Sequence, residues 1–403
     1  DTFSAAAPLC GYHSYFIRKD TSARPLRPWE IARMHHWSTA SWAGNGRDLP
    51  LYVAHGLKDH PLTNSKVLIE AYNELGYSVS QEWPDIGHAV WTVSYRGAKL
   101  WPWLSQRVRP TTPEHVTIVS DSLRYGRRYW AELRQLERHG TRARLDAKRT
   151  SPTTFEVRTE NVRQFRLSPA ITPGQRLSVV VDRETLDVPV GSALEFSRTD
   201  RWRVGALATT NEKRAGVEGP IRDVFLGPVL FVYGSENAST LRANREVAER
   251  FGRFHQGMTI AYPVVADRAL TSELATKHSL VLVGTPADNS VLRALAGKLP
   301  IETVSDGIRA GGRHYSGENV GAIFIQPNPQ HPDRYVVVIT APSVGGIWRA
   351  LSLPQLLPDF IVYDVNLRDA ATQQVLGDAR VRAAGFFERD WSWPKGVVDE
   401  VGG

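Results

Sequence analysis

Apolar and polar positions change their spacing along the chain, and these changes divide it into three regions. In the first region, residues 1–107, the apolar run Leu51–Ala54 is followed by an apolar stripe at helical spacing over residues 63–75. Alternating positions follow over residues 77–83, with Gly76 and Pro84 as the breaks between elements. This order predicts a strand, a crossover helix and a second strand that lies beside the first in a parallel sheet.

The second region, residues 108–211, is dominated by period-two alternation separated by turn residues. The runs that predict strands are residues 116–119, 142–147, 155–159, 163–167 and 176–181. Residues 125–137 fit both a helix and a strand, and we interpret them as a strand. Closely spaced strands with turn signals indicate a β-sandwich-like domain.

After a polar linker at 212–219, the third region alternates continuous apolar runs with helical patterns. The predicted strands are residues 229–233, 259–263, 279–283, 323–325, 335–340 and 360–363, and the predicted helices are 239–254, 289–299 and 345–353. Such a pattern predicts a doubly wound, flavodoxin-like α/β domain over residues 220–393, with a closing strand and a tail at 394–403. Glycines 234 and 284 follow two of the strands, and we interpret them as tight turns and not phosphate sites, because no Gly-x-Gly-x-x-Gly or Walker pattern is present.

The composition is that of an ordinary globular protein, with 42% apolar and 23% charged residues. The formal charge of +7 is modest for 403 residues, and basic residues are interleaved with acidic ones. We therefore expect no nucleic-acid partner. No apolar stretch approaches 18 residues, so we also expect no membrane span.

Candidate ligands for a metal or cofactor are few. Cys10 is the single cysteine, lies at the end of an apolar run and is interpreted as a buried, inert thiol. His35 and His36 are neighbours in sequence, which is poor spacing for ligands of one ion. His55 precedes a glycine turn and is assigned a structural role. We expect neither a cofactor nor a metal.

One pair of residues carries candidate chemistry. Asp59 lies in the turn after the strand at 51–54, and His88 lies in the turn after the strand at 77–83. Because catalytic groups collect at the carboxyl ends of parallel strands, we expect these two side chains to meet. A carboxylate that hydrogen-bonds an imidazole selects its tautomer and stabilises its charged form, which is the arrangement of a general base and its orienting residue.

The residues around this pair resemble a known family. The runs His-Gly-Leu-Lys-Asp-His (55–60) and Ile-Gly-His-Ala-Val-Trp (86–91), and the opening run Asp1–Leu9, are similar to the closing part of the catalytic domain of prolyl oligopeptidase-family serine peptidases. The resemblance implies a partial α/β-hydrolase sheet in residues 1–107, and hence a fold class of α/β plus β. It also implies a Ser…Asp…His order in which Asp59 and His88 are catalytic.

The nucleophile motif of that family, Gly-x-Ser-x-Gly, does not occur in the sequence. We therefore expect the chain to be the C-terminal part of a longer serine hydrolase, with its serine in a missing N-terminal half, and to be inactive alone. The substrate is expected to be a peptide, with a carboxylic ester as the alternative. A further alternative is a non-catalytic binding or scaffold protein. The resemblance slightly favours a secreted or periplasmic location, but the sequence does not assign the compartment.

Overall fold

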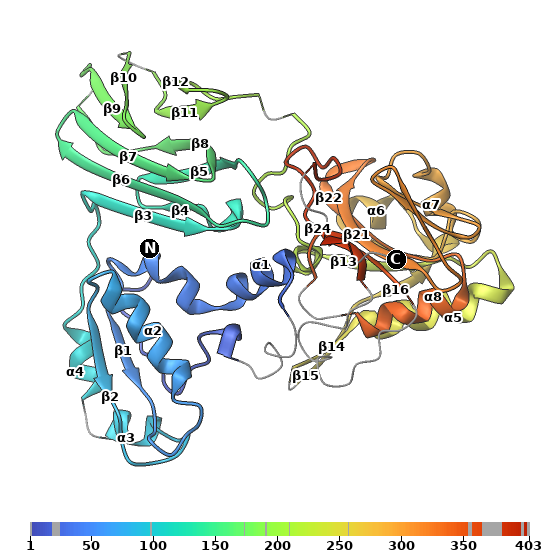
Figure 1. Cartoon of the computed structure of the whole chain (residues 1–403), viewed down its shortest axis with the longest axis horizontal. Helices are drawn as coiled ribbons and strands as arrows, with labels where there is room; N and C mark the ends of the chain where they lie inside the picture. Colours follow the sequence, from blue (N-terminus) through green and yellow to red (C-terminus); the bar gives the residue numbers. More distant parts are fainter. Residues whose placement is uncertain are drawn as a thin grey trace. The chain divides into compact units, whose positions relative to one another are not determined.

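The computed structural model describes residues 2–17, 25–96, 99–172, 174–189, 192–208, 210–256, 258–353, 357–364, 381–395 and 399–400. The chain contains both helices and strands, and the strands form several sheets (Figure 1). The prediction of a mixed α and β protein is therefore confirmed. The chain divides into two compact units, residues 1–22 with 34–210 and residues 23–33 with 211–403. The described helices are all too short or too polar to cross a lipid bilayer.

The first part of the first unit is a small parallel sheet. Strands β1 (Leu51–Ala54) and β2 (Val79–Glu82) pair in parallel, and helix α2 (Thr63–Glu74) connects them. The opening residues add a third extended segment, because Ala6 and Leu9 form parallel bridges with β1. The other helical segments here are η1 (Tyr15–Ile17), η3 (Thr39–Gly46), α3 (Trp91–Arg96) and α4 (Leu100–Ser105). Helix α1 (Pro28–Trp37) begins in the segment 23–33 that belongs to the second unit.

Strand β1 is buried on both faces, which explains its unbroken apolar sequence. Leu51 and Val53 pack against α2, whereas Tyr52 and Ala54 pack against the segment around Val90 and α4. Helix α2 ends where predicted, because Gly76 takes a positive φ of 70°. The order of strand, crossover helix and strand predicted for residues 51–83 is thus the observed one.

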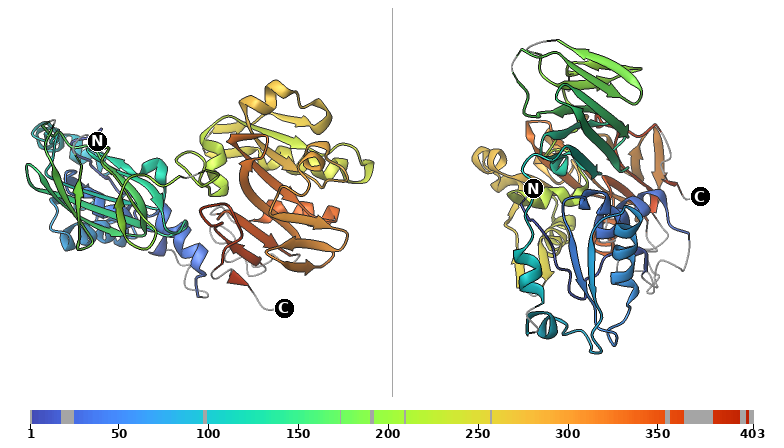
Figure 2. Two further views of the ribbon diagram at one scale, coloured as in Figure 1. Left: turned by 90° about the horizontal axis from the view of Figure 1, so that it is seen from above. Right: turned by 90° about the vertical axis from the view of Figure 1, so that its left-hand side faces the viewer.

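The β module (residues 115–204) consists of two five-stranded sheets, drawn in green in Figure 2. One has the order β10-β9-β7-β6-β3 and the other β12-β11-β8-β5-β4. Its elements are β3 (His115–Ser120), η4 (Leu123–Tyr125), β4 (Arg127–Arg128), β5 (Ala131–Leu136), β6 (Ala143–Ser151), β7 (Thr154–Glu160), β8 (Val162–Leu167), β9 (Leu177–Val181), β10 (Glu184–Val188), β11 (Glu195–Arg198) and β12 (Trp202–Val204). The strand interpretation of residues 125–137 is confirmed by β4 and β5.

Alternating apolar residues from both sheets of the β module fill one core. Phe165 on β8 stacks on Phe196 of β11, with ring centroids 4.9 Å apart. Trp130 meets Phe155 of the other sheet edge-on at 5.7 Å. Each of these aromatic side chains removes a large apolar area from water, so they contribute strongly to the stability of the module.

The second unit is built on an eight-stranded sheet of order β16-β13-β17-β22-β21-β23-β24-β25. Its strands are β13 (Val229–Tyr233), β16 (Val264–Ala266), β17 (Ser279–Val283), β21 (Gly321–Asn328), β22 (His331–Thr340), β23 (Phe360–Tyr363), β24 (Val381–Gly385) and β25 (Asp399–Glu400). Its helical segments are η5 (Ile221–Leu226), α5 (Ala238–Phe251), η6 (Asp267–Ala269), α6 (Ser272–Lys277), α7 (Ser290–Ala294), α8 (Val344–Arg349) and η7 (Ala350–Ser352). Helix α5 packs beside α8 and against β13 and β17.

This sheet corrects the expectation of a doubly wound, flavodoxin-like domain. Only β16, β13, β17 and β22 are parallel, and every pair from β22 through β21, β23 and β24 to β25 is antiparallel. The run predicted as a sheet strand at 259–263 instead belongs to a separate hairpin, β14 (Arg253–Gln256) with β15 (Met258–Ala261). A three-stranded meander, β18 (Ile301–Val304), β19 (Gly307–Ala310) and β20 (Arg313–Ser316), was not predicted.

The core of the second unit also encloses an ion pair. Lys213 and Asp359 bond to each other, and their side chains are 0% and 1% exposed. Asp359 also accepts a hydrogen bond from the backbone N–H of Phe387 at 3.0 Å. Burial raises the pKa of Asp359, and the Lys213 ammonium opposes that effect.

Candidate active site

The candidate site is formed by two turns at the carboxyl ends of β1 and β2. The turn after β1 closes with a hydrogen bond from the Asp59 N–H to the Gly56 carbonyl, 2.9 Å. It is joined to the turn after β2 by two backbone bonds, from Leu57 N–H to Pro84 (2.9 Å) and from Lys58 N–H to Ile86 (3.0 Å). These bonds bring the residue five positions after β1 next to the residue six positions after β2.

Asp59 and His88 meet as the sequence predicts. The His88 Nδ1–H donates to Asp59 Oδ2 at 2.8 Å. Since an ionised carboxylate only accepts hydrogen bonds, this contact assigns the proton of a neutral imidazole to Nδ1 and leaves Nε2 as the basic nitrogen. The His88 side chain is 66% exposed, whereas that of Asp59 is 20% exposed. The ring of Trp91 meets His88 edge-on at 5.4 Å and limits its orientation.

The carboxylate of Asp59 is stabilised in its ionised form. The hydrogen bond from His88 lowers the pKa of Asp59 below its ordinary value, and the Cys10 thiol adds to this while partial burial opposes it. Asp59 is therefore a carboxylate at neutral pH, which is the form that can orient and charge-stabilise an imidazole.

His55 stabilises the turn that carries Asp59. This buried ring is 2.7 Å from Ser65 Oγ through Nδ1 and 3.1 Å from the Asp59 carbonyl oxygen through Nε2. Both ring nitrogens are used within the protein, so the contacts support the structural role expected for His55.

Cys10 is a member of the site that the sequence reasoning missed. It follows the segment that pairs with β1, has a φ of 50°, and its Sγ lies within 4.8 Å of ligand atoms of Asp59 and His88. Burial raises the pKa of the Cys10 thiol, and the neighbouring Asp59 carboxylate raises it further. The available signal was its position at the end of the apolar opening run, which the resemblance places in the same partial α/β-hydrolase sheet.

Gly56 controls how closely the two turns approach. A Cβ on Gly56 would overlap the carbonyl oxygens of Ile86 and Gly87, whereas a Cβ on Gly87 would meet nothing within 4 Å. We expect Gly56→Ala to push the turn that carries His88 outward. If Asp59 and His88 act as a catalytic pair, a displacement of about 1 Å would cost on the order of 100-fold in turnover, measured as kcat once the nucleophile is supplied.

Gly87→Ala is the matched control for this prediction, since it adds the same methyl group to the facing turn without a collision. It should retain kcat within about threefold, because no atom has to move. Equal losses in the two variants would contradict the proposed role of the close approach.

His13 is buried and makes the stability of the first unit depend on pH. Its Nδ1 is 2.8 Å from Thr39 Oγ1, and its Nε2 has no hydrogen-bond partner among the described residues. Burial, with a contribution from the nearby His55, lowers the pKa of His13 to about 4. In the unfolded chain the His13 imidazole is protonated below about pH 6.5. In the folded chain it becomes protonated only near pH 4, so protonation between these pH values favours unfolding.

The expected result is a stability that is complete above pH 6.5 and falls as the pH drops toward 4. Between pH 7 and pH 5, His13 should account for a loss of about 2 kcal/mol in the free energy of unfolding. Urea unfolding of the wild type and of His13→Asn at both pH values measures this difference. An identical pH dependence in both proteins would contradict it.

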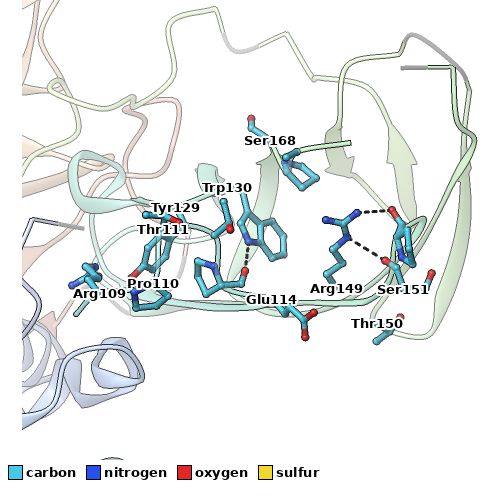
Figure 3. A pocket seen from close by; sticks show the side chains of 15 residues that line it. Arg109, Pro110, Thr111, Glu114, Tyr129, Trp130, Arg149, Thr150, Ser151 and Ser168 are labelled. Carbon is cyan, nitrogen blue, oxygen red and sulfur yellow. Dashed lines mark hydrogen bonds between the residues drawn. The ribbon is translucent and has the colours of Figure 1, made fainter. Parts of the chain in front are cut away.

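A cavity with a volume of about 1190 Å³ lies elsewhere in the first unit, on the β module. Figure 3 shows that residues 109–114, 129–130, 149–152 and 168–170 line it. Two of its polar side chains bond within the protein: Arg149 donates to the carbonyls of Ser151 and Pro152, and Trp130 donates to that of Pro113. The described lining residues include no His, Cys or Asp, and Glu114 is their one carboxylate, so the cavity has no acid–base pair like that of Asp59 and His88.

The remaining sequence candidates have structural partners. His35 and His36 bond to different residues, Ser41 and Asp121. In the second unit, a Cβ on Gly234 or Gly284 would collide with Asp288, which supports their interpretation as tight turns.

Neither a protein-family model nor a curated protein matches the chain.

Proposed function

We propose that these residues carry the general base and the orienting carboxylate of a serine hydrolase with a partial α/β-hydrolase sheet. The observation that supports this most directly is the 2.8 Å hydrogen bond from a largely exposed His88 to Asp59 at two adjacent parallel strand ends. A histidine serving only to stabilise a core would be buried, as His55 is. The nucleophilic serine is supplied from outside these 403 residues.

In this mechanism, His88 Nε2 takes the proton of the serine hydroxyl as the oxygen attacks the substrate carbonyl carbon. The resulting imidazolium is stabilised by the Asp59 carboxylate, and it then gives its proton to the leaving amine or alcohol. A water molecule, deprotonated by the same nitrogen, attacks the acyl-enzyme carbonyl, and the imidazolium returns this proton to the serine oxygen as the carboxylic acid product is released.

The substrate class is an acyl compound, and we propose a peptide bond with an ester as the second possibility. The similarity of residues 55–60 and 86–91 to prolyl oligopeptidase-family peptidases supports the peptide. Trp91 leaves 40% of its surface exposed next to His88, so an apolar substrate group can contact it. The fold accommodates both reactions, and the shape of the pocket decides between them.

The experiment is an activity-based one on the protein extended at its N-terminus to include the serine. A fluorophosphonate should label one serine in the extended protein, and His88→Gln should remove the labelling while leaving the fold intact by circular dichroism. Parallel assays on p-nitrophenyl esters and proline-containing peptides then assign the substrate. Unchanged labelling in His88→Gln, or the absence of a reactive serine, would refute the proposal and leave a binding or scaffold role.

A further inference from the structure

The three strand ends of the first unit bring together three different metal-ligating groups. Among the described residues, Cys10, Asp59 and His88 form the group whose ligand atoms (Sγ, a carboxylate oxygen and a ring nitrogen) all lie within 4.8 Å of one another. Each comes from a separate segment: the opening extended segment, the turn after β1 and the turn after β2. The pairing of these segments in one sheet fixes the spacing of the three groups.

The chemistry of this set favours one class of ion. Magnesium and calcium prefer all-oxygen sites, whereas a thiolate, an imidazole and a carboxylate together suit zinc and related first-row transition metals. Zinc ligands lie about 2.0–2.3 Å from the metal, which places tetrahedral donor atoms about 3.5 Å apart. Side-chain rotations that move the ligand atoms by about 1 Å would therefore let all three coordinate one ion.

Access to the set is open on one side. His88 is largely exposed, so an ion can reach the three groups from solvent, and a water molecule can complete the coordination. The other His–Asp pairs of the first unit, such as His36 with Asp121 at 2.9 Å, do not have a cysteine within such a group. Cys10 is thus the feature that distinguishes this pair from the others.

We propose that Cys10, Asp59 and His88 bind a zinc ion, with water as the fourth ligand. Binding would draw Asp59 and His88 onto the metal and away from their mutual hydrogen bond. This inference does not depend on the proposed hydrolase activity. If that activity is present, zinc at this site acts as an inhibitor, because it occupies the atoms that relay the proton.

The test uses cobalt(II) as a spectroscopic substitute for zinc on the 403-residue chain. Coordination by a thiolate produces an intense charge-transfer absorption in the near ultraviolet, and Cys10 is the single cysteine of the sequence, so any such band reports on Cys10. We expect the band to saturate at one equivalent of cobalt and to disappear when zinc is added. Magnesium should leave it unchanged.

Three variants and a control complete the test. Cys10→Ser should abolish the band, and Asp59→Asn and His88→Gln should each weaken cobalt binding more than about tenfold. His36→Gln, which breaks a His–Asp pair without a cysteine, should leave binding unchanged. A missing band at saturating cobalt, or a band that survives both Asp59→Asn and His88→Gln, would overturn the proposal. The measurement needs no substrate, so its outcome is separate from that of the hydrolase assay.

Discussion

Replacement of Asp59 by Asn is expected to lower kcat of the proposed serine hydrolase about 10⁴-fold, with little change in its fold. The carboxamide can occupy the space of the carboxylate, but it can present its NH₂ group to the imidazole and thereby favour the tautomer with the proton on Nε2. That tautomer cannot accept the proton of a serine. Asn also lacks the negative charge that stabilises the imidazolium in the transition state.

The matched control is Asp85→Asn, in the same turn as His88. Asp85 pairs with Lys58 at 3.0 Å on the surface, and both side chains are well exposed. Because exposed ion pairs contribute about 0–1 kcal/mol, this variant should keep nearly full kcat. A loss below about tenfold in Asp59→Asn would show that Asp59 does not orient the base.

Replacement of Lys213 by Met is expected to destabilise the second unit by about 3–5 kcal/mol. The methionine preserves much of the buried side-chain volume, so the effect arises from leaving the Asp359 carboxylate buried without its cation. Lys213 also lies 4.8 Å from the centre of the Trp391 ring, and that packing is weakened as well. Chemical denaturation followed by tryptophan fluorescence measures the change in the free energy of unfolding.

Lys277→Met is the comparison for this prediction. Lys277 pairs with Glu273 at 2.7 Å on the surface of the same unit, so its loss should cost less than about 0.5 kcal/mol. Similar effects in the two variants would mean that burial of the Lys213–Asp359 pair is unimportant for stability.

The meeting of Asp59 and His88 could be predicted from the sequence because local signals and topology agreed there. The stripe of α2 lies between two short apolar runs, and one crossover helix between adjacent strands leaves their carboxyl ends on the same edge. Cys10 was missed because the extended segment before it pairs with β1 only through two isolated bridges. A chain segment that is only partly paired has no distinctive pattern, and an apolar flank alone suggested a buried thiol.

The direction of the strands in the second unit could not be read from their composition. A strand buried on both faces has the same continuous apolar run whether its neighbours are parallel or antiparallel. The decisive signal is the length of the connection: β21 and β22 are joined by two residues, which permits only a hairpin. The two apolar runs in the sequence, 323–325 and 335–340, are separated by many more residues than the turn contains. Both strands continue past these runs with polar residues that pair with each other, so the sequence pattern did not reveal the short turn.

The second unit is not continuous in sequence, because it includes residues 23–33. Within that segment, Trp29 is 2% exposed and belongs to the apolar core of the unit. A polypeptide that begins at Asn211 would lack this indole and leave a void in the core. Truncation of a large buried aromatic side chain costs about 3–5 kcal/mol in the free energy of unfolding. Dissection of the protein at the 210–211 junction therefore removes an interior part from the C-terminal piece, and a self-sufficient version requires residues 23–33 to be grafted back by circular permutation or added as a separate peptide.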